Sequence, residues 1–472
     1  MKDKEIPGRR EKNRLRCVRE SRVRSQLMNA AERIAKEVND AGGRTFYVGG
    51  FVRDKLLGID SKDVDIEVHG IEPEALYRIL EKVGDPITFG KSFGVFALRN
   101  EHLDIAMPRR EHATGKGHRD FEIDVDPYIG TEGAARRRDF TINSIMQDVL
   151  TGEIVDHFGG REDIANKVIR HIDPETFIED PLRVLRGAQF AARFAFTIAP
   201  DTIELCRGID LSALSKERVE EELKKALLKA DRPSIFFEEL RKMDQLHTWF
   251  PELEPLIGLE QDPIFHPEGD VWTHTMEVLD RAAAMRDKVS DPYRFMLLAL
   301  THDLGKAVTT EEKNGRIHAY EHETKGVPLV ESFIKRLTNE RDVIAYLKNM
   351  VPLHMRPNVS AYSKPGVKST NRMFDEAVAP EDLIWFAAAD RPVFAGSDEF
   401  TGDSEFLIGR LRLYNETMAK PYVTGRDLID AGIEPGDDFS EILAYAHKLR
   451  LAGVDKAPAL KQTLSYARKL RK

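Results

Sequence analysis

Cysteine and long apolar runs are scarce in this sequence of 472 residues. The only cysteines, Cys17 and Cys206, lie far apart and lack the spacing of a metal site. This scarcity argues against a disulfide scaffold and favours a reducing compartment, so we expect a cytoplasmic protein. No apolar run approaches the roughly 18 residues that a membrane span needs. The N-terminus carries no apolar segment of the signal-peptide type, so we expect neither an anchor nor a secretion signal.

An excess of positive charge is also absent, because 71 basic residues face 80 acidic ones and leave a formal net charge of −9. This balance does not exclude nucleic acid as a partner, since binding depends on where basic groups cluster. Residues 1–27 hold one such cluster, made of Arg9, Arg10, Lys12, Arg14, Arg16, Arg19, Arg22 and Arg24. We interpret this segment as a basic flexible leader, and a phosphate-binding arm that turns helical on RNA is the alternative.

One stretch, residues 46–68 (FYVGGFVRDKLLGIDSKDVDIEV), organises the rest of the sequence. A glycine pair breaks a short apolar run, and an Arg-Asp pair follows where a helix would begin. The alternating end of the stretch predicts a strand, in which Asp63 and Asp65 project from the same face. Two carboxylates beside a glycine turn predict a site for Mg²⁺ and a nucleoside triphosphate, whereas a solvated strand edge is the alternative.

This stretch resembles the active-site motif of the DNA polymerase beta nucleotidyltransferase superfamily. It is most similar to that of CCA-adding enzymes and poly(A) polymerases, which reads GGxVRD followed by DxD. Here residues 49–54 read GGFVRD and residues 63–65 read DVD. The resemblance implies that Asp63 and Asp65 are catalytic and hold two Mg²⁺ ions. It also implies that Gly50 and Arg53 bind the triphosphate.

A third carboxylate follows in residues 102–109 (HLDIAMPR), which predict a neighbouring strand. Asp104 matches the third catalytic acid of the superfamily, which can accept the proton of an attacking hydroxyl or complete a metal's shell. A plain strand-face aspartate is the alternative. Residues 111–133 are polar with little periodicity and predict a mobile loop, where the family has its flexible loop. The segment at 90–98 (GKSFGVFAL) resembles CCA-adding enzymes more than poly(A) polymerases, which are more basic there.

Residues 136–143 (RRRDFTIN) resemble the family motif RRDFTIN and place three arginines before an apolar helix. A guanidinium can grip phosphate through two parallel hydrogen bonds. We therefore expect Arg138 to bind the triphosphate and Asp139 to accept from a ribose 2′-hydroxyl. An exposed basic turn is the alternative.

Residues 179–186 (EDPLRVLR) resemble the motif EDxxRxxR, with Asp180, Arg183 and Arg186 three apart on one helix face. An acid and bases placed this way usually form a surface salt bridge, which is the alternative. An Asp acceptor beside an Arg donor matches cytosine and adenine, whereas uracil and guanine would leave buried groups unpaired at about 1–3 kcal/mol each. We expect Asp180 and Arg183 to select CTP and ATP, and Arg186 to help bind the triphosphate. The family pattern commonly has a further Arg where this chain has Gln189.

A second cluster comprises His274, His302, Asp303 and Asp390, and it resembles the H…HD…D metal ligands of HD phosphohydrolases. Mixed imidazole and carboxylate ligands suit a transition metal such as Ni, Mn or Fe. His322 and His354 could hold a second metal, although a lone histidine is otherwise a core or surface residue.

The sequence is identified as a member of the CCA-adding tRNA nucleotidyltransferase and poly(A) polymerase family with a fused HD domain. The resemblance implies an α+β fold: a polymerase-beta-like head with a mixed sheet, followed by helices. We expect a head at 28–162, a helical neck and body at 163–262, an HD domain at 263–395 and a helical RNA-binding tail at 396–472.

The resemblance also implies tRNA, CTP and ATP as partners, no membrane, and addition of CCA to the tRNA 3′ end. The HD domain is expected to hydrolyse phosphorylated or cyclic-phosphate ends of RNA or nucleotides. The alternatives are a poly(A) polymerase, an enzyme that adds only CC or only A, and an HD phosphohydrolase with a nucleotide-binding head. A non-catalytic RNA-binding protein is a further alternative, and the sequence does not predict the oligomeric state.

Overall fold

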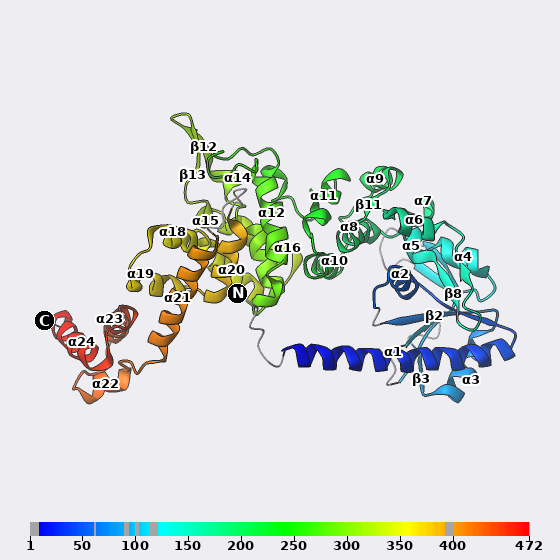
Figure 1. The fold of residues 1–472 in the computed structure, drawn as a ribbon, viewed down its shortest axis with the longest axis horizontal. Coiled ribbons are helices and arrows are strands. Elements are labelled where there is room, and N and C mark those ends of the chain that lie inside the picture. The colour runs from blue at the N-terminus through cyan, green and yellow to red at the C-terminus, as the bar shows by residue number, and fades with distance from the viewer. Residues whose placement is uncertain are drawn as a thin grey trace. The chain divides into compact units, whose positions relative to one another are not determined.

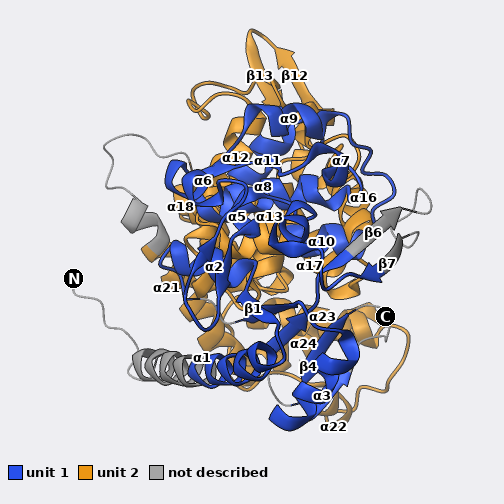
Figure 2. Cartoon of the chain, turned by 90° about the vertical axis from the view of Figure 1, so that its right-hand side faces the viewer, with its two compact units in different colours: residues 1–222, 235–245 blue, residues 223–234, 246–472 orange. Residues whose placement is uncertain are grey.

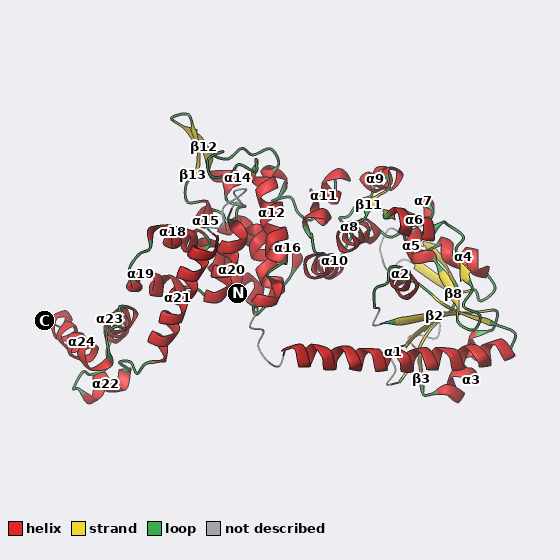
Figure 3. Cartoon of the chain, viewed as in Figure 1, coloured by secondary structure: helices red, strands yellow, loops and turns green. Residues whose placement is uncertain are grey.

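The computed structural model describes residues 9–60, 63–88, 94–99, 103–113, 121–391 and 400–471. The chain divides into two compact units (Figure 2). The first unit comprises Met1–Glu222 and Ile235–Gln245, and the second comprises Leu223–Ser234 and Leu246–Lys472. Strands concentrate in the first unit, whereas the second is largely helical (Figure 3). These observations confirm the α+β class expected from the sequence.

A long helix, α1 (Arg9–Asp40), begins the described part of the first unit (Figure 1). No Gly or Pro interrupts this segment, and its Arg, Glu, Leu and Ala residues favour a helix. Its second half buries Ile34 and Val38 in the core that it shares with the sheet. The helix begins at Arg9, within the segment that the sequence led us to interpret as a flexible leader. Residue 27 consequently marks no break in secondary structure, and residues 1–8 lie outside the described residues.

A seven-stranded mixed sheet has the order β3-β4-β5-β2-β1-β8-β9. Its strands are β1 (Arg44–Tyr47), β2 (Val64–His69), β3 (Pro86–Thr88), β4 (Val95–Leu98), β5 (Leu103–Ala106), β8 (Met146–Asp148) and β9 (Ile154–Val155). Only β2 and β5 pair in parallel, and the other neighbours in this sheet are antiparallel. Parallel neighbours need a crossover, which here includes helix α3 (Pro73–Val83). The strands predicted at the end of residues 46–68 and within residues 102–109 are confirmed as β2 and β5.

The burial pattern of β2 explains why its acids are available for chemistry. Val64, Ile66 and Val68 are fully buried in the core formed with α1 and α3. Because successive residues of a strand point to opposite faces, Asp65 projects from the other side. The sequence alternation thus fixes which face of the sheet carries the carboxylates.

The mobile loop predicted over residues 111–133 was wrong for much of that segment. Strands β6 (Arg109–Ala113) and β7 (Phe121–Val125) form an antiparallel pair, and helix α4 (Gly130–Arg136) follows. The alternation of apolar and acidic residues in the sequence FEIDV, a strand signal, had been overlooked. Residues 114–120 lie outside the described part of the chain.

Short elements complete the first unit. They are α2 (Gly50–Leu56), α5 (Thr141–Ser144), α6 (Gly160–Asn166), β10 (Val168–Ile169), α7 (Pro174–Phe177), α8 (Leu182–Phe194), β11 (Thr197–Ile198) and α9 (Pro200–Arg207). Helices α10 (Lys216–Lys229) and α11 (Ser234–Lys242) contribute residues to both units. The neck expected at 163–262 is therefore divided between the units.

Helices dominate the second unit. They are η1 (Glu254–Leu256), α12 (Val271–Ala283), η2 (Arg286–Lys288), α13 (Pro292–Thr301), α14 (Lys306–Thr309), α15 (His322–Lys325), α16 (Val327–Leu337), α17 (Arg341–Met350), η3 (Val351–Leu353), α18 (Met355–Ser363), α19 (Val367–Glu376), α20 (Pro380–Asp390), α21 (Phe400–Ala419), α22 (Gly425–Asp430), α23 (Phe439–Leu451) and α24 (Lys456–Leu470). No described helix of the chain combines the length and the apolar character that crossing a membrane requires.

One hairpin departs from the helical body that the sequence led us to expect. Strands β12 (Thr310–Lys313) and β13 (Arg316–Ala319) pair antiparallel across Asn314 and Gly315. Both turn residues have positive φ, 55° and 73°, which the Asn-Gly pair tolerates and which matches the twist of a two-residue hairpin. The Asn-Gly pair was thus an available signal for this turn.

Candidate functional site

Three carboxylates predicted to be catalytic lie on adjoining strands of the first unit. Asp65 of β2 and Asp104 of β5 are direct partners in the parallel ladder, and Asp63 immediately precedes β2. Burial and the negative charges of Asp104 and Asp63 raise the pKa of Asp65 to about 6, although Arg138 opposes this shift. Carboxylates crowded in this way are the oxygen ligands that Mg²⁺ takes, so the residues present fit this ion.

The glycine turn brings a guanidinium close to these carboxylates. Gly49 has φ 63°, and a Cβ at this position would lie 3.2 Å from Nη1 of Arg138 and 3.8 Å from Oδ2 of Asp65. Glycine serves both the backbone conformation and the close approach. Arg138 donates from Nη2 to Oε2 of Glu67 at 3.2 Å, which holds the guanidinium beside Asp65.

Glu67 is a buried partner that the sequence reasoning missed. It also accepts from Nε2 of His69 at 2.9 Å. Burial alone would raise the pKa of Glu67, but the hydrogen bond from His69 and the charge of Arg138 lower it to about 2. The period of two that united Asp63 and Asp65 also places Glu67 on their face, so the signal was available.

Arg53 is buried in a dense set of contacts. It donates to Oδ1 of Asp54 from Nε at 2.8 Å and from Nη2 at 2.6 Å, and to Oδ1 of Asn143 from Nη1 at 2.6 Å. Its guanidinium also lies over the rings of Phe190 and Phe194, at 5.1 and 4.7 Å from their centroids. These contacts tie α2 to α5 and α8, and the triphosphate contact expected of Arg53 stays a prediction. The same holds for Gly50, the first residue of α2.

Asp139 is also engaged on both oxygens. Oδ1 accepts from the backbone N–H of Phe140 at 2.8 Å and from Nδ2 of Asn143 at 2.9 Å. Oδ2 accepts from Nε of Arg186 at 2.8 Å and lies 2.6 Å from its Nη2. Burial opposes the charge, but Arg186 keeps the pKa of Asp139 below its usual range. A ribose hydroxyl would have to replace one of these donors, so that contact stays a prediction.

The expected base-selecting pair, Asp180 and Arg183, does not form a direct ion pair. Oδ2 of Asp180 instead lies 3.0 Å from Nη2 of Arg218, a residue of α10 that the sequence reasoning assigned no role. Arg183 donates from Nη1 to the carbonyl of Thr176 and from Nη2 to that of Arg137, both at 2.8 Å. The role of this pair in selection stays a prediction, and Arg218 joins it as the carboxylate's partner.

In the second unit, local sequence signals place the predicted HD ligands at helix ends. Helix α13 starts after Asp291, whose side chain accepts from two backbone N–H groups of the first turn, with Pro292 at the first position. The side chains of residues 295–300 are fully buried. The C-terminal end of this core helix therefore delivers His302 and Asp303 into the interior.

Four of the predicted ligands converge there as a first donor group. Nε2 of His274, in the first turn of α12, lies 3.1 Å from Oδ1 of Asp390 and 3.4 Å from Nε2 of His302. Oδ2 of Asp303 lies 3.2 Å from Nε2 of His302 and 3.6 Å from Nε2 of His274. Three imidazole and carboxylate donors close enough to share one ion are thus present in His274, His302 and Asp390.

A second donor group lies on the other oxygen of Asp303. Oδ1 of Asp303 is 3.2 Å from Nε2 of His322 and 3.9 Å from Nε2 of His354, and the two imidazole nitrogens are 3.3 Å apart. A Cβ at Gly305 would lie 2.0 Å from the carbonyl oxygen of His322, so glycine is required for this close packing. Asp303 therefore bridges the two groups, and all six predicted residues come together.

Hydrogen bonds fix which ring nitrogens face the centre. His302, His322 and His354 each donate from Nδ1 to a backbone carbonyl three residues earlier, at 2.9, 2.8 and 2.7 Å. His274 uses its Nδ1 toward Glu268 at 2.6 Å. In a neutral ring the other nitrogen, Nε2, then presents a lone pair. Four such nitrogens facing one another and two carboxylates fit a divalent transition metal, because a cation between them removes the repulsion.

The charges of this cluster shift its pKa values strongly. Burial alone would lower the pKa of His274, but hydrogen bonds with Asp390 and Glu268 raise it to about 9. Burial and the neighbouring His302 lower the pKa of His354 to about 3. His274 therefore holds a proton at neutral pH in the absence of metal, whereas His354 is neutral.

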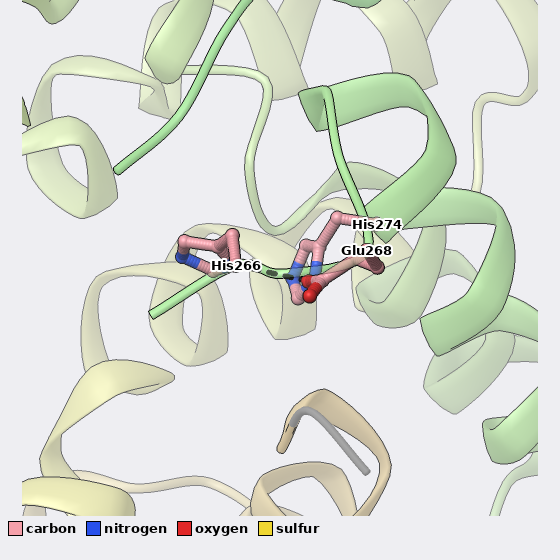
Figure 4. A group of neighbouring side chains, drawn as sticks. All are labelled: His266, Glu268 and His274. Atoms are coloured by element: carbon pink, nitrogen blue, oxygen red, sulfur yellow. Dashed lines mark hydrogen bonds and ion pairs between the residues drawn. The ribbon is translucent and has the colours of Figure 1, made fainter. Parts of the chain in front are cut away.

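Glu268 supports the cluster from outside, and the sequence reasoning missed it (Figure 4). Its Oε1 accepts from Nδ1 of His274 at 2.6 Å and from Nδ1 of His266 at 3.0 Å. Its side chain is 7% exposed, and the hydrogen bonds from both imidazoles lower its pKa despite partial burial. The polar run HPEGD directly before α12 was the available signal.

A cavity of about 1090 Å³ lies over this cluster. Asp303, His322, His354 and Asp390 contribute to its lining. The two donor groups are therefore accessible to a small molecule or to the end of a chain.

Three family models match separate parts of the chain. Residues 45–170 match the Poly A polymerase head domain, and residues 271–391 match the HD domain. Residues 195–257 match the probable RNA and SrmB-binding site of polymerase A. The matched ranges contain the three carboxylates of the first unit and the six predicted HD ligands of the second. His266 and Glu268 lie just before the HD range.

Curated relatives resemble the chain over most of its length. The multifunctional CCA protein of Nitrosococcus oceani is 36% identical over 404 residues, which are 84% of this chain and 95% of that protein. The protein of the same name from Actinobacillus pleuropneumoniae serotype 5b is 39% identical over 328 residues, 68% of this chain and 77% of that protein.

Solved structures share the fold. The Thermotoga maritima CCA-adding enzyme complexed with tRNA(CCA) aligns with a TM-score of 0.63 at 20% identity, over 94% of this chain and 98% of that one. A CCA-adding enzyme in complex with ATP aligns with a TM-score of 0.65, also at 20% identity, over 95% of this chain and 94% of that one. Its complex with CTP gives 0.64 at 20% identity, over 94% and 98% of the two chains.

Proposed function

Because the chain belongs to the family of multifunctional CCA proteins, we propose that it adds CCA to the 3′ end of tRNA from CTP and ATP. The 3′-hydroxyl of the tRNA attacks the α-phosphorus of CTP, of a second CTP and then of ATP. Each step forms one phosphodiester bond and releases pyrophosphate. The HD domain makes the protein a phosphohydrolase as well.

The carboxylate cluster of the first unit carries the proposal for nucleotide addition. We assign Asp63 and Asp65 as ligands of Mg²⁺, and Asp104, opposite Asp65 in the ladder, as the third acid. When bound, Mg²⁺ lowers the pKa of an attacking hydroxyl and stabilises the departing pyrophosphate. Arg138, which Glu67 holds beside Asp65, supplies positive charge for the triphosphate.

The contacts on α8 suggest how the base and sugar are selected. Asp180 and Arg183 are assigned to the Watson–Crick edge of cytosine and adenine, and Asp139 to the ribose. In the protein without nucleotide, Arg218 donates to Asp180, and Arg183 donates to two backbone carbonyls. An incoming base must therefore exchange partners with groups that are already satisfied, and a mismatched base would leave them unpaired.

The convergent donor groups carry the proposal for hydrolysis. We assign His274, His302, Asp303 and Asp390 to one divalent transition metal, such as Ni, Mn or Fe. His322 and His354, with the shared Asp303, are assigned to a second. Bound ions of this kind lower the pKa of a water for attack on phosphorus. The substrates that we infer are phosphorylated or cyclic-phosphate ends of RNA or nucleotides.

An addition assay tests the first activity directly. A tRNA that lacks its last three nucleotides is incubated with CTP, with ATP, or with both, and the product length is measured. Addition of CC with CTP alone and of CCA with both nucleotides is the expected result. A long A tail, or a stop after CC with both nucleotides present, would instead identify a poly(A) polymerase or a partial adding enzyme.

The metal identities and the location of the protein in the cell are part of the proposal. Mg²⁺ suits the carboxylate oxygens of the first site, and imidazole-rich ligands suit transition metals in the second. A cytoplasmic location suits an enzyme of tRNA maturation, and the buried thiol of Cys206 forms no disulfide. Elemental analysis of the purified protein would identify the metal in the HD domain.

A further inference from the structure

Two aromatic side chains on the lining of the HD cavity are exposed to an unusual degree. The residue exposure is 60% for Phe265 and 90% for Tyr362. Both belong to the lining of the cavity over the metal ligands. Large apolar side chains left in solvent beside a functional cavity mark a place where a ligand is covered.

Each aromatic residue is linked to a metal ligand through one intermediate residue. Phe265 directly precedes His266, whose ring meets that of His274 edge-on at 4.7 Å between centroids. Tyr362 lies four residues, about one helical turn, beyond Asn358 on α18. Asn358 donates from Nδ2 to Oδ2 of Asp390 at 3.3 Å. Both aromatic residues thus line the same cavity as the donor groups, and each is connected to one of them through a neighbouring residue.

The lining of the cavity has a charged part beside Asp303, here called the floor, and an apolar part on α18. Lys306 is buried, and its Nζ lies 2.7 Å from Oδ2 of Asp303 and donates to Oε1 of Gln261, also at 2.7 Å. Its positive charge and those of bound divalent ions favour a phosphate at the floor. Met355 and Tyr362, seven residues apart on α18, belong to one helix face and both line the cavity. The occupant therefore combines an anionic group with a flat apolar one.

We propose that Phe265 and Tyr362 form a stacking subsite for the base of a nucleotide whose phosphate lies at the HD ligands. This subsite rests on the proposed hydrolase function and adds the residues that select the substrate. A ring that stacks needs no matching hydrogen bonds, so the subsite accepts any base but rejects phosphate esters that lack one. In the reaction, water adds to phosphorus, one P–O bond of the cyclic ester breaks, and the freed sugar oxygen takes a proton from the water.

A matched pair of substrates tests the subsite in the full-length protein with Mn²⁺ supplied. Adenosine 2′,3′-cyclic phosphate and glycerol 1,2-cyclic phosphate carry the same five-membered ester, but only the first carries a base. In Tyr362→Leu and Phe265→Leu, the ratio of kcat/KM for adenosine over glycerol ester should fall about five- to a hundredfold, chiefly through KM. Tyr362→Phe retains the ring and should lose much less.

Controls separate the subsite from damage to the fold. Tyr422→Ala removes an exposed aromatic residue that does not line the cavity and should keep the parent ratio. An RNA oligonucleotide ending in a 2′,3′-cyclic phosphate tests whether the nucleotide is a free molecule or the end of an RNA chain. A loss seen with both the oligonucleotide and the free nucleotide supports a subsite for either. A loss confined to the oligonucleotide assigns the subsite to RNA ends. An unchanged ratio in both leucine variants would overturn the proposal.

Measurements of binding test the subsite even if the protein hydrolyses neither ester. Adenosine 2′-monophosphate and inorganic phosphate are titrated calorimetrically into the Mn²⁺-loaded parent and variants. Any binding to the nucleotidyltransferase site is common to all of them, because that site is unaltered. The leucine variants should bind the nucleotide more weakly and phosphate as well as the parent does. A parent that hydrolyses neither ester would contradict the hydrolase function, whereas equal nucleotide affinity in all variants would contradict the subsite.

Discussion

The two sites of this chain differ in how their charged groups are satisfied in the unbound protein. In the first unit, acids and arginines pair with one another, as in Arg186 with Asp139 and Arg218 with Asp180. In the second unit, imidazole nitrogens face each other and two carboxylates, and their hydrogens are fixed on the outer side by carbonyls and by Glu268.

This difference indicates two ways of preparing a site. Groups that are already paired must give up a partner to receive a nucleotide, so binding is coupled to recognition of the correct one. Imidazole and carboxylate groups that converge are preorganised for one kind of ligand, a cation, which needs only to displace the proton of His274. The first arrangement suits selection between similar triphosphates, and the second suits tight retention of a metal.

The largest effect is expected from a change to the carboxylates of the first unit. Asp65→Ala removes a proposed ligand of Mg²⁺, so addition of both C and A should fall by at least about a thousandfold, while cyclic-phosphate hydrolysis persists. Binding of tRNA, measured separately, should be largely retained. Asp85→Ala, which loses only an exposed ion pair with Arg99, is the matched control. Substantial residual addition by Asp65→Ala would remove this residue from the catalytic assignment.

The corresponding change in the second unit is Asp303→Asn. This carboxylate bridges both donor groups, so its neutral isostere should release the metal and lower hydrolysis by at least about a hundredfold. Nucleotide addition should continue, because Asp303 and Asp65 belong to separate units. Metal content, hydrolysis and addition are measured on one preparation of the variant. An unchanged unfolding temperature of that preparation shows that the variant is folded. Loss of addition in the folded variant would show instead that the two sites are coupled.

The sequence indicated which residues come together in the two candidate sites better than it indicated their partners. Alternation in β2 and the spacing of the HD motif depend on local periodicity, which a sequence displays directly. Asp180 and Arg218 pair across 38 residues of sequence, and no local pattern encodes such a contact. Glu67 lay within a motif already identified and Glu268 shortly before His274, but their roles depend on burial, which only the fold determines.

The same distinction holds for the fold. The sheet, its catalytic strand and the core helix α13 follow from strong apolar patterns. The hairpin β12–β13 and the pair β6–β7 were missed because their strands are short and polar, so the turn and alternation signals carried the only information. The start of α1 was missed because charge was interpreted as flexibility, although arginine and glutamate favour helices.

A smaller effect is expected where the first site selects its base. Asp180→Ala should raise incorporation of UTP and GTP relative to CTP and ATP by about five- to 150-fold, because mismatched bases no longer leave this part-buried carboxylate without a matching donor. Triphosphate affinity should change less. Glu204→Ala, which loses only an exposed pair with Arg207, is the control. If the Asp180 variant incorporates C and A as selectively as the parent, base selection occurs elsewhere.

Glu268→Gln tests the support of the second site with a similar or smaller effect. The neutral amide removes the negative charge that strengthens the hydrogen bonds from both imidazoles, so metal affinity should fall about ten- to a hundredfold. Competition with a chromophoric chelator measures this affinity. His266→Ala is the matched variant, since it removes the other donor to the same oxygen and leaves His274 in place. Equal losses in the two variants would contradict a role of Glu268 through His274.

A change of about tenfold per pH unit is expected from a difference in pH dependence between the two sites. Hydrogen bonds with Asp390 and Glu268 outweigh burial and raise the pKa of His274 to about 9, so a metal must displace a proton from this ring at any lower pH. Affinity of the HD domain for Mn²⁺ should therefore rise about tenfold per pH unit between pH 6 and 8 and level off above about 9. Burial and acidic neighbours raise the pKa of Asp65 to about 6. Mg²⁺ therefore competes with a proton for this carboxylate only as the pH falls through about 6. The Mg²⁺ requirement of nucleotide addition should thus stay constant from pH 7 to 8.5, while chelator competition at the same pH values follows the HD site. An Mn²⁺ affinity that is flat between pH 6 and 8 would contradict the protonated state of His274. A matching slope for Mg²⁺ would remove the difference between the two sites.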